Sequence, residues 1–195
     1  MNTTRKFGLT MLLFLPFAFG SKAQTSPDAV ISGPVPSNKE WRISIGVETG
    51  IPTGAYANTY GSFFGASVQV DAPLCYGLYA TVTGGYNNVL AKDNKPSINT
   101  QLIPVKAGLR YFFWGDLIYF QAQAGVTFLA NRSDLNADNS AAFTYTPGVG
   151  ALLKLPSKNY LDLGVRWEET ASFSNRSDGN RYGLVALRVA YSFGL

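Results

Sequence analysis

The amino-acid sequence contains no histidine and only one cysteine, Cys75. Without histidine, no imidazole can activate a nucleophile, bind a metal ion or titrate near neutral pH. Cys75 has no second cysteine with which to form an internal disulfide. From these absences we expect a protein that is not an enzyme and that uses no cofactor or metal ion.

Long apolar runs are also scarce. One extended apolar run lies near the N-terminus. It spans residues 7–20 (FGLTMLLFLPFAFG), follows Arg5 and Lys6, and precedes Ser21-Lys22-Ala23. A positive start, an apolar stretch and small residues at positions −3 and −1 predict a signal peptide, residues 1–23, cleaved after Ala23. The alternative is an uncleaved anchor, but a membrane-spanning helix needs about 20 apolar residues. We therefore expect export to the cell envelope.

Charge is low and nearly balanced once this segment is removed. The whole chain has 16 Lys and Arg against 12 Asp and Glu, and Arg5, Lys6 and Lys22 belong to the predicted signal peptide. The remainder gives no reason to expect a nucleic-acid partner. Residues 24–40 contain three prolines and little periodicity, which predicts a flexible periplasmic lead-in. Residues 41–195 are then one domain by length.

From Trp41 onward, the sequence alternates between apolar and polar or small residues. In the first segment Ile43, Ile45 and Val47 alternate with Arg42 and Ser44. A period of two is typical of β-strands with two different faces. Eight such segments can be delimited, at residues 41–49, 64–71, 78–86, 101–113, 118–129, 143–154, 160–168 and 182–195.

The connections between these segments alternate in length. Short turns are expected near residues 72–76, 114–117 and 155–159, and longer polar loops near 51–61, 87–99, 130–141 and 170–181. Transmembrane barrels have short periplasmic turns and longer external loops. The sequence therefore predicts an all-β fold, an eight-stranded antiparallel up-and-down transmembrane β-barrel in the bacterial outer membrane. Outer-membrane lipids would then be its immediate partners.

A soluble eight-stranded barrel has the same strand count but the opposite distribution of polarity, with apolar residues inside. Two features favour the membrane barrel. The polar face of the segments is rich in Gly, Ser, Thr and Gln, and it lacks the Lys and Glu density of a water-exposed surface. Aromatic residues also gather near strand ends, as in interfacial girdles: Trp41, Tyr86, Tyr111, Phe113, Trp114, Tyr119, Phe128, Phe143, Trp167, Tyr191 and Phe193.

Isolated charges lie on the face predicted to line the lumen. They are Arg42, Glu48, Asp71, Lys106, Arg110, Lys154, Asp162, Arg166, Glu168 and Arg188. An eight-stranded barrel is only wide enough inside for side chains, and buried charges must pair. We therefore predict a salt-bridge network that fills the lumen, with Lys106 and Arg110 facing Glu48, Asp162 or Glu168. A narrow gated ion path is the alternative. Pro104 predicts a local kink or bulge.

The last segment keeps its alternation to the chain end, with Tyr191, Phe193 and Leu195 on one face. This resembles the C-terminal signal that barrel-assembly machinery recognises, although that signal usually ends in an aromatic residue. The segment QLIPVKAGLRYFF, residues 101–113, resembles the "IPV…LRYYF" strand of outer-membrane β-barrel proteins common in Bacteroidota, a group that includes PorT-like proteins. The resemblance implies an eight-stranded barrel and no shared activity.

These observations leave three functional hypotheses. The first is a structural or interaction role in envelope integrity, in adhesion or in a complex with an envelope protein partner. The second is a narrow channel for ions or small solutes. The third is a secreted soluble barrel that binds a small apolar ligand. Catalysis by Ser44, Ser67 or Ser192 is disfavoured, because only Lys, Arg or carboxylate partners are available to these lumen-face serines.

Overall fold

The structure of the protein is a computed structural model that describes residues 40–93, 98–135, 138–173 and 181–195. The predicted signal peptide and residues 24–39 of the predicted lead-in lie outside the described residues. Within the described parts, no helix is long and apolar enough to cross a membrane.

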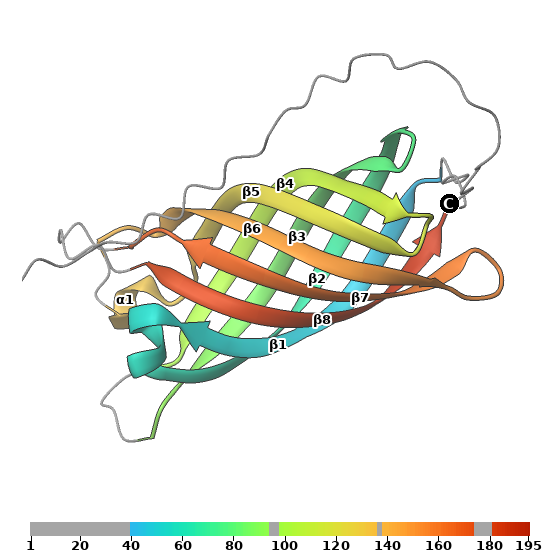
Figure 1. Cartoon of the computed structure of the whole chain (residues 1–195). Helices are drawn as coiled ribbons and strands as arrows, with labels where there is room; N and C mark the ends of the chain where they lie inside the picture. Colours follow the sequence, from blue (N-terminus) through green and yellow to red (C-terminus); the bar gives the residue numbers. More distant parts are fainter. Residues whose placement is uncertain (1–39, 94–97, 136–137, 174–180) are drawn as a thin grey trace, which may run out of the picture. The chain divides into compact units, whose positions relative to one another are not determined.

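Eight antiparallel strands form a closed barrel in which each strand pairs with its neighbours in sequence (Figure 1). The barrel closes where β1 pairs with β8, and Ser44 lies opposite Ser192 in that pair. This confirms the predicted fold class. The strands are β1 (Arg42–Thr53), β2 (Tyr60–Cys75), β3 (Leu78–Ala91), β4 (Thr100–Trp114), β5 (Ile118–Leu129), β6 (Ala141–Lys154), β7 (Asn159–Thr170) and β8 (Tyr182–Gly194).

Two short helices lie at the end of the barrel opposite the C-terminus (Figure 1). They are the 3-10 helix η1 (Gly54–Asn58), between β1 and β2, and α1 (Arg132–Leu135), after β5. We call this end the loop end. The other end, the turn end, has tight connections at residues 76–77, 115–117 and 155–158. Gly77 and Gly115 adopt φ angles of 75° and 57° there, a left-handed conformation that glycine adopts without steric cost.

Several strands are longer than the alternation predicts. β2 begins at Tyr60 rather than residue 64, and β3 continues to Ala91 rather than ending at residue 86. The added residues pair with each other, because Phe63 lies opposite Val89. Pairing with a neighbouring strand therefore extends the sheet into segments whose polar, glycine-containing sequence predicts loops.

No bulge forms at Pro104, so that part of the prediction is wrong, whereas the local kink stays a prediction. Register shifts occur instead near Tyr60, Cys75 and Phe112. Between β3 and β4 the pairing stops after Gly84–Val105 and resumes at Asn87–Leu102 with the same register. Proline lacks the N–H group that a ladder needs, so the ladder is interrupted at this point without the insertion of an extra residue.

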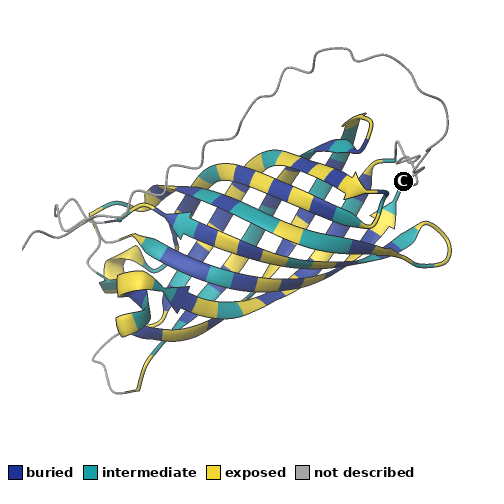
Figure 2. Cartoon of the chain, in the orientation of Figure 1, coloured by how far each residue is buried: buried dark blue, intermediate teal, exposed yellow. Residues whose placement is uncertain are grey.

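Buried and exposed residues alternate along every strand (Figure 2). The outward face carries exposed Ile, Val and Leu side chains, such as Ile45, Val105 and Leu187. Exposed aromatic side chains lie near the strand ends, among them Trp41, Phe113, Trp114, Phe128, Phe143 and Trp167. Tyr119, predicted for the girdle, is an exception: it is buried inside the barrel, because it lies on the inward face of β5 next to the turn.

Candidate functional site

The interior of the barrel is the candidate functional site. Nine of the ten charged residues predicted to line the lumen are buried inside it: Arg42, Glu48, Asp71, Lys106, Arg110, Asp162, Arg166, Glu168 and Arg188. Lys154 is the exception. It is the last residue of β6 and is exposed, because the alternation continues past the point where the enclosed lumen ends.

We call these nine buried charged residues the charged layer. Asp162 on β7 lies at its centre. One carboxylate oxygen, Oδ2, accepts hydrogen bonds from Arg110 Nη2 and Arg188 Nη1, each at 3.0 Å. The other oxygen accepts from the Tyr119 hydroxyl at 2.5 Å. Through these three donors, one carboxylate joins β4, β5, β7 and β8 across the lumen.

Arg110 bridges Asp162 to a second carboxylate, Asp71 on β2. Its Nη1 donates to Asp71 Oδ2 at 2.9 Å, and its Nε donates to Gln121 at 2.8 Å. The guanidinium carbon also lies 4.0 Å from the centroid of the Tyr119 ring, a cation–π distance. Gln69 donates to Asp71 at 2.6 Å. Each of the three nitrogens of this guanidinium donates to a group from a different strand, so Arg110 is held in place.

Two further ion pairs complete the charged layer. Lys106 pairs with Glu168 and also donates to Thr146 at 3.2 Å. Arg166 pairs with Glu48, and Arg188 Nε lies 3.8 Å from the same Glu48 carboxylate. The structure thus brings Lys106 to Glu168 and Arg110 to Asp162, two of the contacts expected from the sequence. Asp71 is a partner of Arg110 that the expectation did not include.

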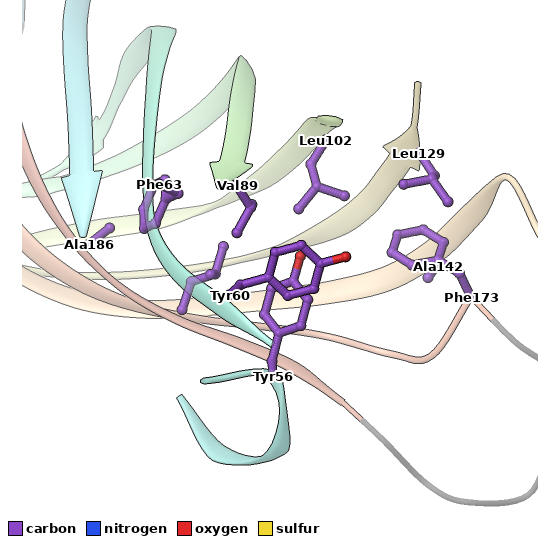
Figure 3. Packing of buried hydrophobic residues seen from close by; sticks show 10 residues of the cluster. Tyr56, Tyr60, Phe63, Val89, Leu102, Leu129, Ala142, Phe173 and Ala186 are labelled. Atoms are coloured by element: carbon purple, nitrogen blue, oxygen red, sulfur yellow. The ribbon is translucent and has the colours of Figure 1, made fainter. Parts of the chain in front are cut away.

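An apolar layer, which we call the loop-end cluster, packs together inside the loop end of the barrel (Figure 3). It consists of Tyr56, Tyr60, Phe63, Val89, Leu102, Leu129, Ala142, Phe173, Leu184 and Ala186. Tyr56 comes from η1 and packs 4.3 Å from the ring of Tyr60. Burial raises the pKa of the Tyr56 phenol above its ordinary value, so this side chain remains neutral within the cluster.

A second apolar layer, which we call the turn-end cluster, lies inside the turn end of the barrel, on the other side of the charged layer. It consists of Tyr79, Phe112, Tyr119, Leu152 and Tyr160. Arg42 stacks on it, with its guanidinium carbon 4.1 Å from the Tyr79 ring centroid and 5.0 Å from that of Phe112. Arg42 Nε also lies 3.8 Å from Asp71. Three layers of side chains therefore fill the lumen.

The lumen serines offer no accessible nucleophile. Ser44 and Ser192 share a hydrogen bond of 2.7 Å, and Ser67 accepts one from Arg188 at 3.2 Å. All three are buried. In the described part of the chain, no group of three Cys, Asp or Glu side chains has the arrangement of a metal site.

Comparison with known proteins supports the fold and leaves the family open. No protein-family model and no curated protein matches the sequence. Among solved structures, the outer membrane protein OprG of Pseudomonas aeruginosa aligns with a TM-score of 0.53 and 10% identity, over 80% of this chain and 96% of OprG. Ail, the attachment invasion locus protein of Yersinia pestis, aligns with a TM-score of 0.50 and 13% identity, over 80% of this chain and 99% of Ail. The chain therefore has the fold of a small outer-membrane β-barrel.

Proposed function

We propose that this protein resides in the bacterial outer membrane as a plugged barrel with a structural or interaction role. That role would lie in envelope integrity, in adhesion or within an envelope complex. The filling of the lumen by two apolar layers and a paired charged layer is the observation that carries the proposal. With its interior occupied, the barrel has its outer face and its loop end available for partners.

The outer face supports placement in a lipid bilayer. Val47, Ile45 and Leu187 are each more than half exposed on strands that no other described element covers from outside. Exposed apolar surface of this extent marks a contact with lipid or protein. A secreted soluble barrel with an apolar ligand, our third hypothesis, would instead need a polar outer face and an apolar pocket inside.

Heating should change the mobility of the protein on a denaturing gel. We expect the unheated protein to migrate as a compact band and the boiled protein to migrate as an unfolded chain, because the closed ladder of eight strands resists detergent. The native protein should also fractionate with outer membranes. Recovery in the soluble periplasmic or extracellular fraction would contradict membrane placement.

Reconstituted in a planar lipid bilayer, the protein should show no steady conductance above that of the bare membrane. The expected result follows from the filled lumen, since ions would have to displace paired and buried groups. Single-channel recording in potassium chloride checks this, with the same detergent without protein as the control. Discrete, ion-selective current steps would contradict the plug and favour our second hypothesis, a narrow channel.

The C-terminal strand supports a further part of the proposal, recognition by barrel-assembly machinery. Tyr191 and Phe193 point outward with ring centroids 4.9 Å apart. Leu195 donates its backbone N–H to Trp41 at 2.9 Å, at the seam where β1 meets β8. We also propose kinship with the outer-membrane barrels of Bacteroidota that include PorT-like proteins, on the sequence of residues 101–113.

A further inference from the structure

The described lumen buries more positive than negative charge. Its cations are Arg42, Lys106, Arg110, Arg166 and Arg188, and its anions are Glu48, Asp71, Asp162 and Glu168. Four of the five cations are arginines, which keep their proton in proteins, and Lys106 is paired with Glu168. One positive charge therefore remains without a counter-charge from the described side chains, and uncompensated buried charge is strongly unfavourable.

A small cavity lies in the charged layer among three of these cations. Arg42 does not line it, and Arg42 Nε and Nη2 also meet no acceptor among the described residues. The cavity has a volume of about 20 Å³, and three guanidinium groups line it, those of Arg110, Arg166 and Arg188. The amides of Gln69 and Gln121 also line it, and no carboxylate does. A single water molecule needs about 10–15 Å³ of such volume. The space thus suits one water molecule or one monatomic ion.

Two of these guanidinium groups have a buried N–H that meets no acceptor among the described residues. They are the Nε of Arg166 and the Nη2 of Arg188, on side chains that are only 7% and 5% exposed. Arg166 Nη2 donates to Glu48, and Arg188 Nη1 and Nε donate to Asp162 and Ser67. A buried donor without an acceptor is unfavourable, so an acceptor in the cavity would be stabilising.

We propose that this cavity is a binding site for one monatomic anion, chloride in ordinary media, held by Arg110, Arg166 and Arg188. An anion would supply both the missing negative charge and the missing acceptor. A water molecule would supply only the acceptor, and a polyatomic anion exceeds the space. The two apolar clusters lie toward the two ends of the lumen from this site, and its lining also includes Val149 and Val165, which are exposed on the outer face.

Bromide diffraction tests the proposal directly. Crystals of the detergent-purified barrel are grown in sodium bromide, and data are collected at the bromine absorption edge. We expect one anomalous peak inside the barrel, in the cavity between the three guanidinium groups. Density for water there, with no anomalous signal at saturating bromide, would overturn the proposal.

The substitution Gln121→Glu places a tethered negative charge in the same cavity with almost no change in shape. Gln121 lines the cavity, and its Oε1 already accepts from Arg110 Nε at 2.8 Å. We expect this variant to lose the bromide peak. We also expect chloride to raise the unfolding temperature of the native protein relative to gluconate at equal sodium concentration, and we expect the variant to lose this shift.

Gln123→Glu is the matched control. Gln123 is buried in the same strand and donates to Thr81 and Thr83, each at 2.8 Å, but it does not line the cavity. The variant carries the same added charge, and we expect it to keep the bromide peak. Heat-modifiable gel mobility verifies that both variants fold. If the bromide peak persists in Gln121→Glu, or if it disappears in both variants, the proposed anion site is wrong.

Discussion

Replacement of Asp162 with asparagine is expected to lower the free energy of unfolding by about 3–5 kcal/mol, the usual effect of removing one partner from a buried ion pair. The Asp162 carboxylate is fully buried and accepts from Arg110 and Arg188 at 3.0 Å each. An asparagine keeps the shape but removes the negative charge, so two buried guanidinium groups lose a counter-charge. Urea unfolding in phospholipid vesicles, followed by tryptophan fluorescence and linear extrapolation, measures the change.

Glu169→Gln is the matched control for Asp162→Asn. Glu169 follows Glu168 on β7 and therefore lies on the opposite face of the strand, where it pairs with Arg181 at 2.6 Å; the Arg181 side chain is 67% exposed and the Glu169 side chain 12%. Exposed ion pairs contribute about 0–1 kcal/mol. The same change from carboxylate to amide should therefore have little effect here. If the two variants lose equal stability, the charged layer does not stabilise the barrel.

The faces of the strands could be predicted from the sequence because the side-chain period of a strand is two residues. A slip of one residue would turn every side chain to the opposite face. Counting along the chain therefore places Arg42, Lys106 and Arg188 on the same inward surface, although they belong to distant segments. The alternation fails at Lys154, because periodicity gives no information on where the enclosed lumen ends.

The pairing within the network could not be predicted from the sequence. Glu48 and Arg166 are 118 residues apart, and they meet across the lumen rather than on neighbouring strands. Which carboxylate reaches which cation depends on the tilt and stagger of all eight strands. Arg110 illustrates this, since its position opposite Gln121 follows from the pairing of β4 with β5, whereas its contact with Asp71 depends on the closed shape.

The two apolar layers of the lumen were missed for a different reason. The lumen of a transmembrane barrel is expected to be polar, so the sequence predicts charged residues there and no apolar layers. Leu102 and Phe112 carry a signal that could have revealed them, because both fall on the inward face by alternation. Tyr56 and Phe173 carry no such signal. They come from connections, where no periodicity indicates that a side chain turns back over the barrel mouth.

Replacement of Phe63 with alanine is expected to lower the free energy of unfolding by about 3–5 kcal/mol, as for other buried aromatic residues. Phe63 is 2% exposed within the loop-end cluster. Its ring lies close to Gly50, where an added Cβ would stand 2.8 Å from Phe63 Cε1, so the site has little freedom to collapse. Urea unfolding in vesicles measures this loss. The variant should stay non-conducting in bilayers, because the charged layer below remains intact.

Phe64→Ala is a control in the neighbouring position of the same strand. Phe64 is 54% exposed on the outward face, where lipid chains as apolar as leucine can fill the space that the ring leaves. Its truncation should therefore destabilise the barrel less than that of Phe63. Equal losses would mean that the loop-end cluster packs no more tightly than the lipid interface.

A current through the Phe63→Ala variant would show that the apolar layer, rather than the ion pairs, closes the lumen.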